Sequence, residues 1–311
     1  MDESWRERLA RGRVLLDGGL GSSLIATGEV ATTKVAGAAL AAPELLLEVH
    51  RGFLAAGAEA VLTNTFGTSR PALAESDHAG RWEELNHAAV RLARQAADER
   101  GGAFVLGDIG PIGFWSRSTS GASMSPRPAS GTEDLSLPRA EALAAAYREH
   151  GALLIEAGVD ALLVETLPGE AEALIALAAL REVCDASITV SFTTTRADGV
   201  FTTLAGEPVV EVLANLEAAG ADALGLNCGE GSEALLQALP ECLAAVGVPL
   251  VAKPNAGQPI PGEWGPVYTQ EPGAFAADLA RATLLGVSAV GGCCGADERF
   301  IAALWACLGG R

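Results

Sequence analysis

Three stretches of this sequence repeat one pattern: Ala56-Gly-Ala-Glu-Ala-Val61, Ala157-Gly-Val-Asp-Ala-Leu162 and Ala219-Gly-Ala-Asp-Ala-Leu224. In each of them a helical pattern stops at a glycine, an acidic residue follows, and an apolar run begins. Glycine is favoured just past the end of a helix because it adopts positive φ without strain. The repeat therefore predicts helices that lead directly into buried strands.

The same alternation covers the whole chain. Apolar runs typical of strands buried on both faces of a parallel sheet occur at 13–17, 60–64, 104–108, 161–165, 188–193, 223–227, 250–253 and 289–292. Helical patterns lie at 43–56, 81–100, 137–157, 170–183, 208–219, 232–246, 273–285 and 297–308. Eight strands and eight helices in alternation predict an α/β fold, a single (β/α)8 TIM barrel domain over residues 1–311.

The alternative α/β fold is a doubly wound sheet. Such a sheet more often carries a glycine-rich phosphate loop after its first strand. Here Gly18-Gly19-Leu20-Gly21 lacks the G-x-G-x-x-G spacing, and no G-x-x-x-x-G-K-[ST] segment occurs. The barrel is therefore favoured.

Composition excludes several classes of protein. The chain has 311 residues and is 49% hydrophobic, but its longest apolar runs, such as 173–180, are much shorter than the roughly 20 residues of a membrane span. The N-terminus has no apolar stretch typical of a secretory signal. The net charge of −18, without a basic patch, disfavours nucleic acid. We expect a cytoplasmic protein with neither a membrane nor a nucleic-acid partner.

Polar and sulfur-containing residues gather where the predicted strands end. In a TIM barrel, chemistry takes place at the C-terminal ends of the strands. The residues at those positions are Asp17, Asn64, Asp108, Glu165, Thr193, Asn227, Cys228, Asn255, Cys293 and Cys294. Their grouping at one rim indicates function more strongly than any of them does alone.

Three of the six cysteines belong to this rim. Cys228 follows the sixth predicted strand, and Cys293 and Cys294 follow the eighth. With no C-x-x-C and no nearby histidine, a zinc finger is not indicated, but three convergent thiolates would leave tetrahedral zinc with one open position. Glycines 291, 292 and 295 would then let the backbone bend to aim two consecutive sulfurs at one ion.

The competing interpretation is that these cysteines are small buried apolar residues, as free cysteines usually are. We expect that role for Cys184, Cys242 and Cys307, which lie in helical patterns. For the three rim cysteines both interpretations remain open at this point. Nucleophilic catalysis with a histidine base is disfavoured, because none of the four histidines lies at the rim.

Segments along nearly the whole chain resemble the homocysteine S-methyltransferase family. They are Leu16-Asp-Gly-Gly-Leu-Gly-Ser, Leu62-Thr-Asn-Thr-Phe-Gly, Gly110-Pro, Val164-Glu-Thr, Gly225-Leu-Asn-Cys-Gly, Pro254-Asn-Ala-Gly and Gly291-Gly-Cys-Cys-Gly. The family includes betaine–homocysteine methyltransferase, S-methylmethionine-dependent enzymes and the homocysteine module of cobalamin-dependent methionine synthase. The sequences of the Pro-Asn-Ala-Gly and Thr-Asn-Thr-Phe motifs are most similar to those of that module, although we expect no folate or cobalamin domain in this chain.

The resemblance implies a (β/α)8 barrel that transfers a methyl group to homocysteine and yields methionine. It implies Zn²⁺ bound by Cys228, Cys293 and Cys294, which activates the substrate thiol. It also implies that Asp17 and Glu165 bind the amino group of homocysteine, and that Asn255 can take the fourth position on zinc when substrate is absent. For these three residues, a cap, an ion pair and a turn are the respective structural alternatives. We expect Asn227 and Thr65 to orient the backbone near the site.

The methyl donor stays open: S-methylmethionine, AdoMet, betaine and a methylcorrinoid protein all remain candidates. Alternative functions are a homocysteine-binding subunit that takes its methyl group from a separate corrinoid protein, a methyltransferase for another thiol or selenol, and a ligand-binding barrel whose zinc is structural. The segment 114–138 is long for a loop that follows a strand. A lid or donor-binding wall and a surface excursion are equally compatible with its composition.

Overall fold

The computed structural model describes residues 3–115, 137–262 and 265–310. Most of the segment 114–138 lies outside these residues, so its role as a lid or as a surface excursion stays a prediction. No helix within the described ranges is long and apolar enough to cross a membrane.

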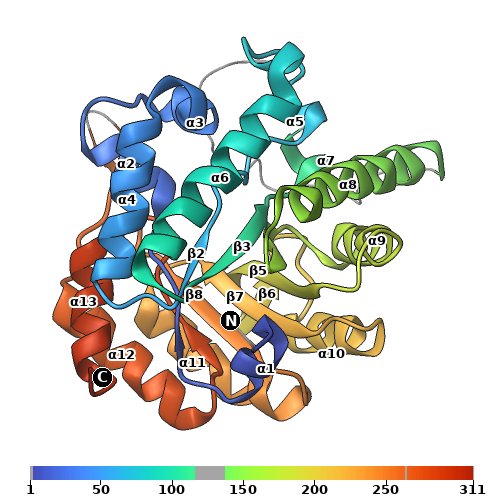
Figure 1. The fold of residues 1–311 in the computed structure, drawn as a ribbon. Coiled ribbons are helices and arrows are strands. Elements are labelled where there is room, and N and C mark those ends of the chain that lie inside the picture. The colour runs from blue at the N-terminus through green and yellow to red at the C-terminus, as the bar shows by residue number, and fades with distance from the viewer. Residues whose placement is uncertain (1–2, 116–136, 263–264, 311) are drawn as a thin grey trace.

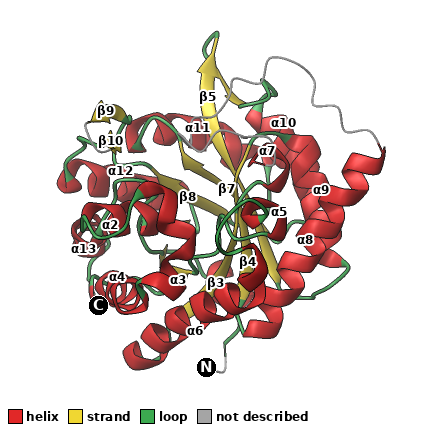
Figure 2. Ribbon diagram, turned by 90° about the horizontal axis from the view of Figure 1, so that it is seen from above, coloured by secondary structure: helices red, strands yellow, loops and turns green. Residues whose placement is uncertain are grey.

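Eight parallel strands form the barrel, and each pairs with the next one along the chain (Figures 1 and 2). They are β1 (Val14–Leu15), β2 (Ala60–Leu62), β3 (Phe104–Ile109), β4 (Ala161–Leu167), β5 (Ser187–Ala197), β7 (Ala223–Cys228), β8 (Leu250–Pro254) and β11 (Ala289–Val290). β11 pairs with β1, and a single bridge from Leu16 to Ala60 joins β1 to β2. This arrangement confirms the predicted barrel.

Eight helices surround the strands, each within three residues of the predicted bounds. They are α4 (Pro43–Ala55), α6 (Trp82–Arg100), α8 (Leu137–Ala157), α9 (Glu170–Arg181), α10 (Val209–Ala218), α11 (Ser232–Ala245), α12 (Pro272–Leu285) and α13 (Glu298–Cys307). Proline opens α4 and α12, and a left-handed glycine ends α6 and α12, as the sequence signals require.

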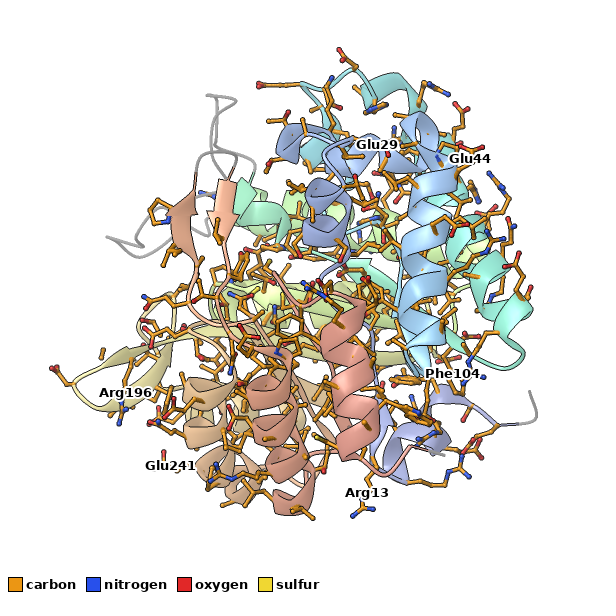
Figure 3. The ribbon with its side chains drawn as sticks, turned by 90° about the vertical axis from the view of Figure 1, so that its left-hand side faces the viewer. Arg13, Glu29, Glu44, Phe104, Arg196 and Glu241 are labelled. Carbon is orange, nitrogen blue, oxygen red and sulfur yellow. The ribbon has the colours of Figure 1, made fainter. Side chains whose placement is uncertain are left out.

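Further short elements were not predicted from sequence. They are α1 (Trp5–Ala10), α2 (Leu20–Ala26), η1 (Thr32–Gly37), α3 (Ala38–Ala41), α5 (Arg70–Leu73), η2 (Ala79–Arg81), α7 (Ile112–Trp115), and the strands β6 (Val200–Thr203), β9 (Ile260–Gly262) and β10 (Gly265–Val267). β6 continues β5 as a hairpin that carries Arg196 away from the body of the molecule (Figure 3).

The repeated Ala-Gly-x-acidic pattern has a definite structural role. Each of its glycines has positive φ: 110°, 98° and 95° at residues 57, 158 and 220. Each acidic side chain accepts a hydrogen bond from a backbone N–H of the preceding barrel strand and pairs with an arginine. The three sets are Glu59 with Leu15 N and Arg8, Asp160 with Val105 N and Arg94, and Asp222 with Ile188 N and Arg181. The pattern thus ends a helix and ties neighbouring strands together.

At the N-terminal end of the strands the barrel interior is apolar, and the helix α1 closes it. A capping box between Ser4 and Glu7 begins this helix, and Trp5 and Leu9 lie in the same buried cluster as Phe104 and Leu163 of the strands. The Trp5 ring meets the Phe104 ring edge to face, with centroids 5.2 Å apart. The N-terminal end of the barrel is therefore filled with side chains.

The three cysteines on helices differ in burial. Cys242 is fully buried, and Cys184 is half-buried against the core, as expected. For Cys307 the expectation of burial is wrong, because this residue is exposed. It is the last residue of α13 and lies beyond Leu304, the last buried residue of that helix.

Candidate functional site

The three rim cysteines come together at the C-terminal end of the barrel. Cys228 is the last residue of β7, and Cys293 and Cys294 follow β11. Their sulfur atoms all lie within 4.8 Å of one another, with 3.0 Å between Cys228 Sγ and Cys293 Sγ and 4.0 Å between Cys293 Sγ and Cys294 Sγ. Two sulfurs on one tetrahedral zinc lie about 3.8 Å apart, given zinc–sulfur bonds of about 2.3 Å. The donor set therefore fits zinc.

A turn after β8 holds both cysteine segments in place. The backbone N–H of Asn255 donates to the carbonyl of Cys228 at 3.1 Å, and the N–H of Ala256 donates to that of Cys294 at 3.0 Å. Cys293 N in turn donates to the carbonyl of Pro254 at 2.8 Å. Cys228 itself has a φ of 56°, a region that few residues other than glycine adopt. The Pro-Asn-Ala-Gly turn thus fixes the positions from which the three sulfurs project.

The glycines beside Cys293 and Cys294 serve mainly close packing. Of the three, only Gly295 has positive φ (80°). A Cβ at Gly292 would lie 2.3 Å from the Cβ of Ala296, and one at Gly291 would lie 2.7 Å from the carbonyl oxygen of Asp17. The expectation that all three bend the backbone is therefore correct only for Gly295.

An amide network orients Cys228. Asn227 Nδ2 donates to Thr166 Oγ1 at 2.6 Å and lies 3.4 Å from Cys228 Sγ as a donor. Its Oδ1 accepts from Ser191 Oγ at 2.7 Å and from Thr166 N at 3.0 Å, which fixes the direction of the amide. Hydrogen bonds of this kind hold a thiolate ligand in its orientation. Asn227 was expected near the site; Thr166 belongs to the Val164-Glu-Thr segment, but no role was predicted for it.

The sulfur cluster favours one thiolate. Hydrogen bonds from Cys228 and Cys293, together with one from Tyr268, hold the pKa of Cys294 well below its ordinary value. The hydrogen bonds of Cys228 with Cys293 and Cys294, together with burial, raise the pKa of Cys228. At Cys293 the hydrogen bond with Cys228 lowers the pKa, whereas the hydrogen bond with Cys294 and burial raise it. The resulting pKa is about 12. Thiolates are the metal-binding form of cysteine, so Cys294 is already in that form, whereas Cys228 and Cys293 would lose their protons when a metal binds. Tyr268 was not anticipated from the sequence.

A group of buried charges lies at the same end of the barrel. Asp17 is 0% exposed: its Oδ1 accepts from Lys253 Nζ at 2.6 Å, and its Oδ2 accepts from Leu62 N at 2.7 Å. The second bond joins β1 to β2 beyond their last backbone bridge. Asp17 therefore closes the barrel seam and pairs with a lysine that sequence reasoning did not assign to the site.

Two other carboxylates face this group with unused oxygens. Asp108 and Glu165 are each 7% exposed, and within the described part of the chain Asp108 Oδ1 and Glu165 Oε2 have no hydrogen-bond partner. Burial, and then the charge of Glu165, raises the pKa of Asp108 well above its ordinary value. Burial, and then the charge of Cys293, raises the pKa of Glu165 to about 8. The charges of Asp17 and Glu165 outweigh burial at Lys253 and raise its pKa.

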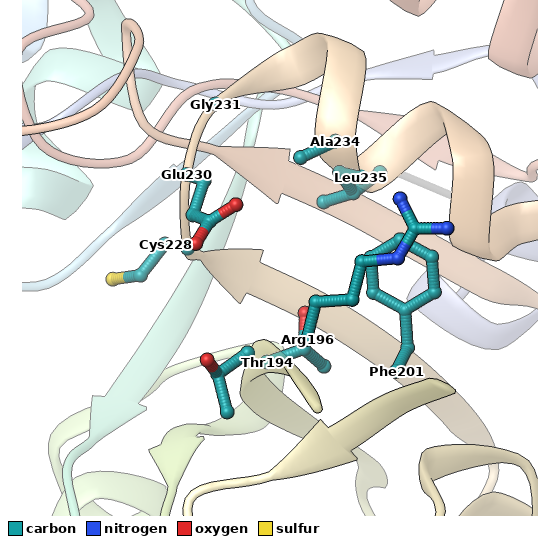
Figure 4. Close-up of a pocket in the computed structure, with 10 residues that line it drawn as sticks. Thr194, Arg196, Phe201, Cys228, Glu230, Gly231, Ala234 and Leu235 are labelled. Atoms are coloured by element: carbon teal, nitrogen blue, oxygen red, sulfur yellow. The ribbon is translucent and has the colours of Figure 1, made fainter. Parts of the chain in front are cut away.

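Asn255 and Thr65 also lie at this end. Asn255 Nδ2 donates to the carbonyl of Gly229 at 2.9 Å, while its buried Oδ1 has no partner among the residues that the structure describes. Thr65 Oγ1 donates to the carbonyl of Asp108 at 2.7 Å and so orients that part of β3. A small hollow lies beside Cys228, lined by residues that include Thr194, Arg196 and Glu230, and the Cys228 sulfur points away from Arg196 (Figure 4).

The chain is similar to known proteins over most of its length. The family model described as Homocysteine S-methyltransferase matches residues 14–308. The methionine synthases of Mycobacterium tuberculosis and Mycobacterium leprae are each 31% identical to the chain, over 83% and 81% of its length. The chain spans only about a fifth of those relatives, 21% and 20%.

A solved structure is similar over almost the whole chain. The metallated form of the homocysteine methyltransferase MmuM from Escherichia coli superimposes with a TM-score of 0.76 and 28% identity. The match covers 94% of this chain and 95% of that one. The similarity therefore extends over almost the whole length of both chains.

Proposed function

The chain belongs to the homocysteine S-methyltransferase family, and we propose that it transfers a methyl group to the sulfur of homocysteine, with methionine as the product. Residues 1–311 then act as one homocysteine-binding barrel domain. The observation that carries this proposal is the convergence of Cys228, Cys293 and Cys294 beside a set of buried carboxylates.

The three cysteines would hold Zn²⁺. Their sulfur spacing fits a tetrahedral site with one position left for a further ligand. Zinc, when bound there, would lower the pKa of a thiol so that it reacts as a thiolate at neutral pH. Asn227 would keep Cys228 in its ligating orientation, and the unpartnered Oδ1 of Asn255 would be available to the fourth position while substrate is absent.

The carboxylates would receive the ammonium group of the amino acid. A buried ammonium needs anionic partners, because an unpaired charge is costly to desolvate. Glu165 offers an oxygen that has no partner among the described residues. Asp17 contributes negative charge while its oxygens accept hydrogen bonds from Lys253 and from Leu62 N. Homocysteine would thus be bound with its amino end on the carboxylates and its sulfur beside the cysteines. The sulfur would then attack the donor methyl carbon, and the donor would leave with the electron pair of the broken bond.

Metal analysis and a donor panel test the proposal. We expect about one zinc per chain, and turnover of homocysteine to methionine with at least one of S-methylmethionine, AdoMet, betaine and methylcobalamin. Turnover only with a methylated corrinoid protein would instead make the chain a subunit of a methyltransferase system. Absence of zinc, or zinc whose X-ray absorption spectrum is unchanged by homocysteine, would contradict the proposed function.

A further inference from the structure

The acidic residues at the C-terminal end of the barrel, which we call the barrel mouth, differ in whether they are paired with a cation. Asp17 and Lys253 form a nearly closed pair, since Lys253 Nζ also donates to the Asp17 carbonyl at 3.2 Å and both side chains are at most 3% exposed. The two oxygens of Asp17 each already accept one hydrogen bond. This pair is neutral overall, so the groups left to balance a bound cation are the remaining two carboxyl groups, Asp108 and Glu165.

Asp108 and Glu165 are neighbours on the inner face of the barrel. In the β3–β4 register Asp108 of β3 pairs with Leu163 of β4, and Glu165 lies two residues after Leu163 in β4. Leu106 and Leu163 both belong to the barrel-interior cluster. Because side chains alternate along a strand, Asp108 lies on the same inward face of β3 as Leu106, and Glu165 lies on the same inward face of β4 as Leu163. Both acidic residues are closer to the C-terminal ends of their strands. Their charges act on each other, which is one cause of the raised pKa of Asp108.

The position of Asp108 is fixed by two buried threonines that leave its carboxylate free. Asp108 N donates to Thr63 Oγ1 at 3.0 Å, and Thr65 Oγ1 donates to Asp108 O at 2.7 Å. The two hydroxyl oxygens lie 2.6 Å apart, and because the Thr65 hydroxyl donates to Asp108 O, the Thr63 hydroxyl donates to Thr65 Oγ1. The backbone is thus held from the segment that follows β2, while Oδ1 stays buried without a partner among the described residues. A buried polar atom in a native structure calls for a partner.

We propose that Asp108 is a further substrate-binding residue, which shares the ammonium group of homocysteine with Glu165 because Lys253 already occupies Asp17. This inference rests on the proposed function. The ammonium supplies three N–H donors, enough for both free carboxylate oxygens. Lys253 then acts as a positioning residue, since it keeps Asp17 engaged and directs the substrate charge toward β3 and β4.

Calorimetry with two thiols tests this contact. Zinc-loaded full-length protein is titrated with L-homocysteine and with 4-mercaptobutyrate, which lacks only the α-amino group. For Asp108→Asn we expect the Kd for homocysteine to rise at least tenfold, while the Kd for 4-mercaptobutyrate changes less than twofold. Asp108→Glu, which keeps the charge, should recover part of the loss.

A matched control lies at the other end of the same two strands. Asp160 accepts from Val105 N and from Arg94, and Asp160→Asn should leave both Kd values unchanged. If Asp108→Asn raises the Kd of both thiols equally, or leaves the Kd for homocysteine unchanged, the assignment of Asp108 is overturned while the proposed function stands. Failure of the unsubstituted protein to bind homocysteine overturns the proposed function as well. If Asp108→Asn loses zinc or its circular dichroism spectrum, Asp108→Ser takes its place with the same two expectations.

Discussion

The two ends of the barrel interior are built from the same strands but differ completely in character. β3 begins with Phe104, packed against Trp5 at the closed end. Four residues later it presents Asp108, one oxygen of which has no hydrogen-bond partner in the part of the chain that the structure describes. β4 likewise begins with the buried Ala161 and reaches Glu165. One end buries apolar surface, which stabilises the fold, whereas the other buries charges and thiols at a free-energy cost. Stability and chemistry are thus separated along each strand.

Removal of one sulfur should produce the largest effect. Cys294→Ala should lose zinc and lower homocysteine methylation by at least about a thousandfold, because two thiolates hold the metal far less tightly than three. The measurements are zinc content by mass spectrometry and methionine formation. Cys242→Ala, in the buried face of α11, is the control that should keep both. Identical behaviour of the two variants would show that the division of the cysteines is wrong.

A substitution at the closed end should act on stability alone. Trp5→Ala removes a buried aromatic ring from the contact with Phe104 and should lower the free energy of unfolding by about 3–5 kcal/mol. Urea unfolding measures this loss. The kcat/KM of the folded protein should change less than twofold, because Trp5 lies away from the sulfur cluster. A large loss of kcat/KM without loss of stability would contradict the separation between the two ends.

The smallest effect that we predict is a pH dependence at the functional end. Burial raises the pKa of Glu165 from about 4.5 to about 8, so the folded state holds this proton where the unfolded chain releases it. The stability that Glu165 contributes is therefore complete below about pH 4.5 and is lost as the pH rises through about 8. Between pH 5 and 8.5 the unsubstituted protein should therefore lose stability that Glu165→Gln keeps. Parallel urea-stability profiles of the two proteins would contradict this.

Most of the fold could be predicted because its signals are local. Gly57, Gly158 and Gly220 mark helix ends, and continuous apolar runs mark buried strands, so all eight strands and all eight outer helices were found. The short α1 was missed because six residues give too little periodicity for a prediction. The role of the acidic residue in the repeat, which binds a backbone N–H on the preceding barrel strand, also required the structure.

The site was predictable where residue type and position both carry information. Cysteines at strand ends are uncommon enough to stand out, and the three sulfurs do converge. Lys253 was taken as the end of a strand, because nothing in its local sequence indicates a partner 236 residues away at Asp17. Asp108 was recognised at the rim but given no role, since its significance depends on which neighbouring carboxylates are already paired. Such long-range charge pairing is a property of the folded molecule.

The helix α1 also determines the route that molecules can take. Among the described residues, Trp5 and Leu9 close the N-terminal end of the barrel, so both reactants of the proposed reaction would enter from the C-terminal end. Homocysteine, whose amino end would reach the carboxylates, would lie deeper than the methyl donor and would have to enter first. Methionine would then leave only after the spent donor had departed. A single helix at the far end of the barrel would in this way impose an order of arrival and departure on the reaction.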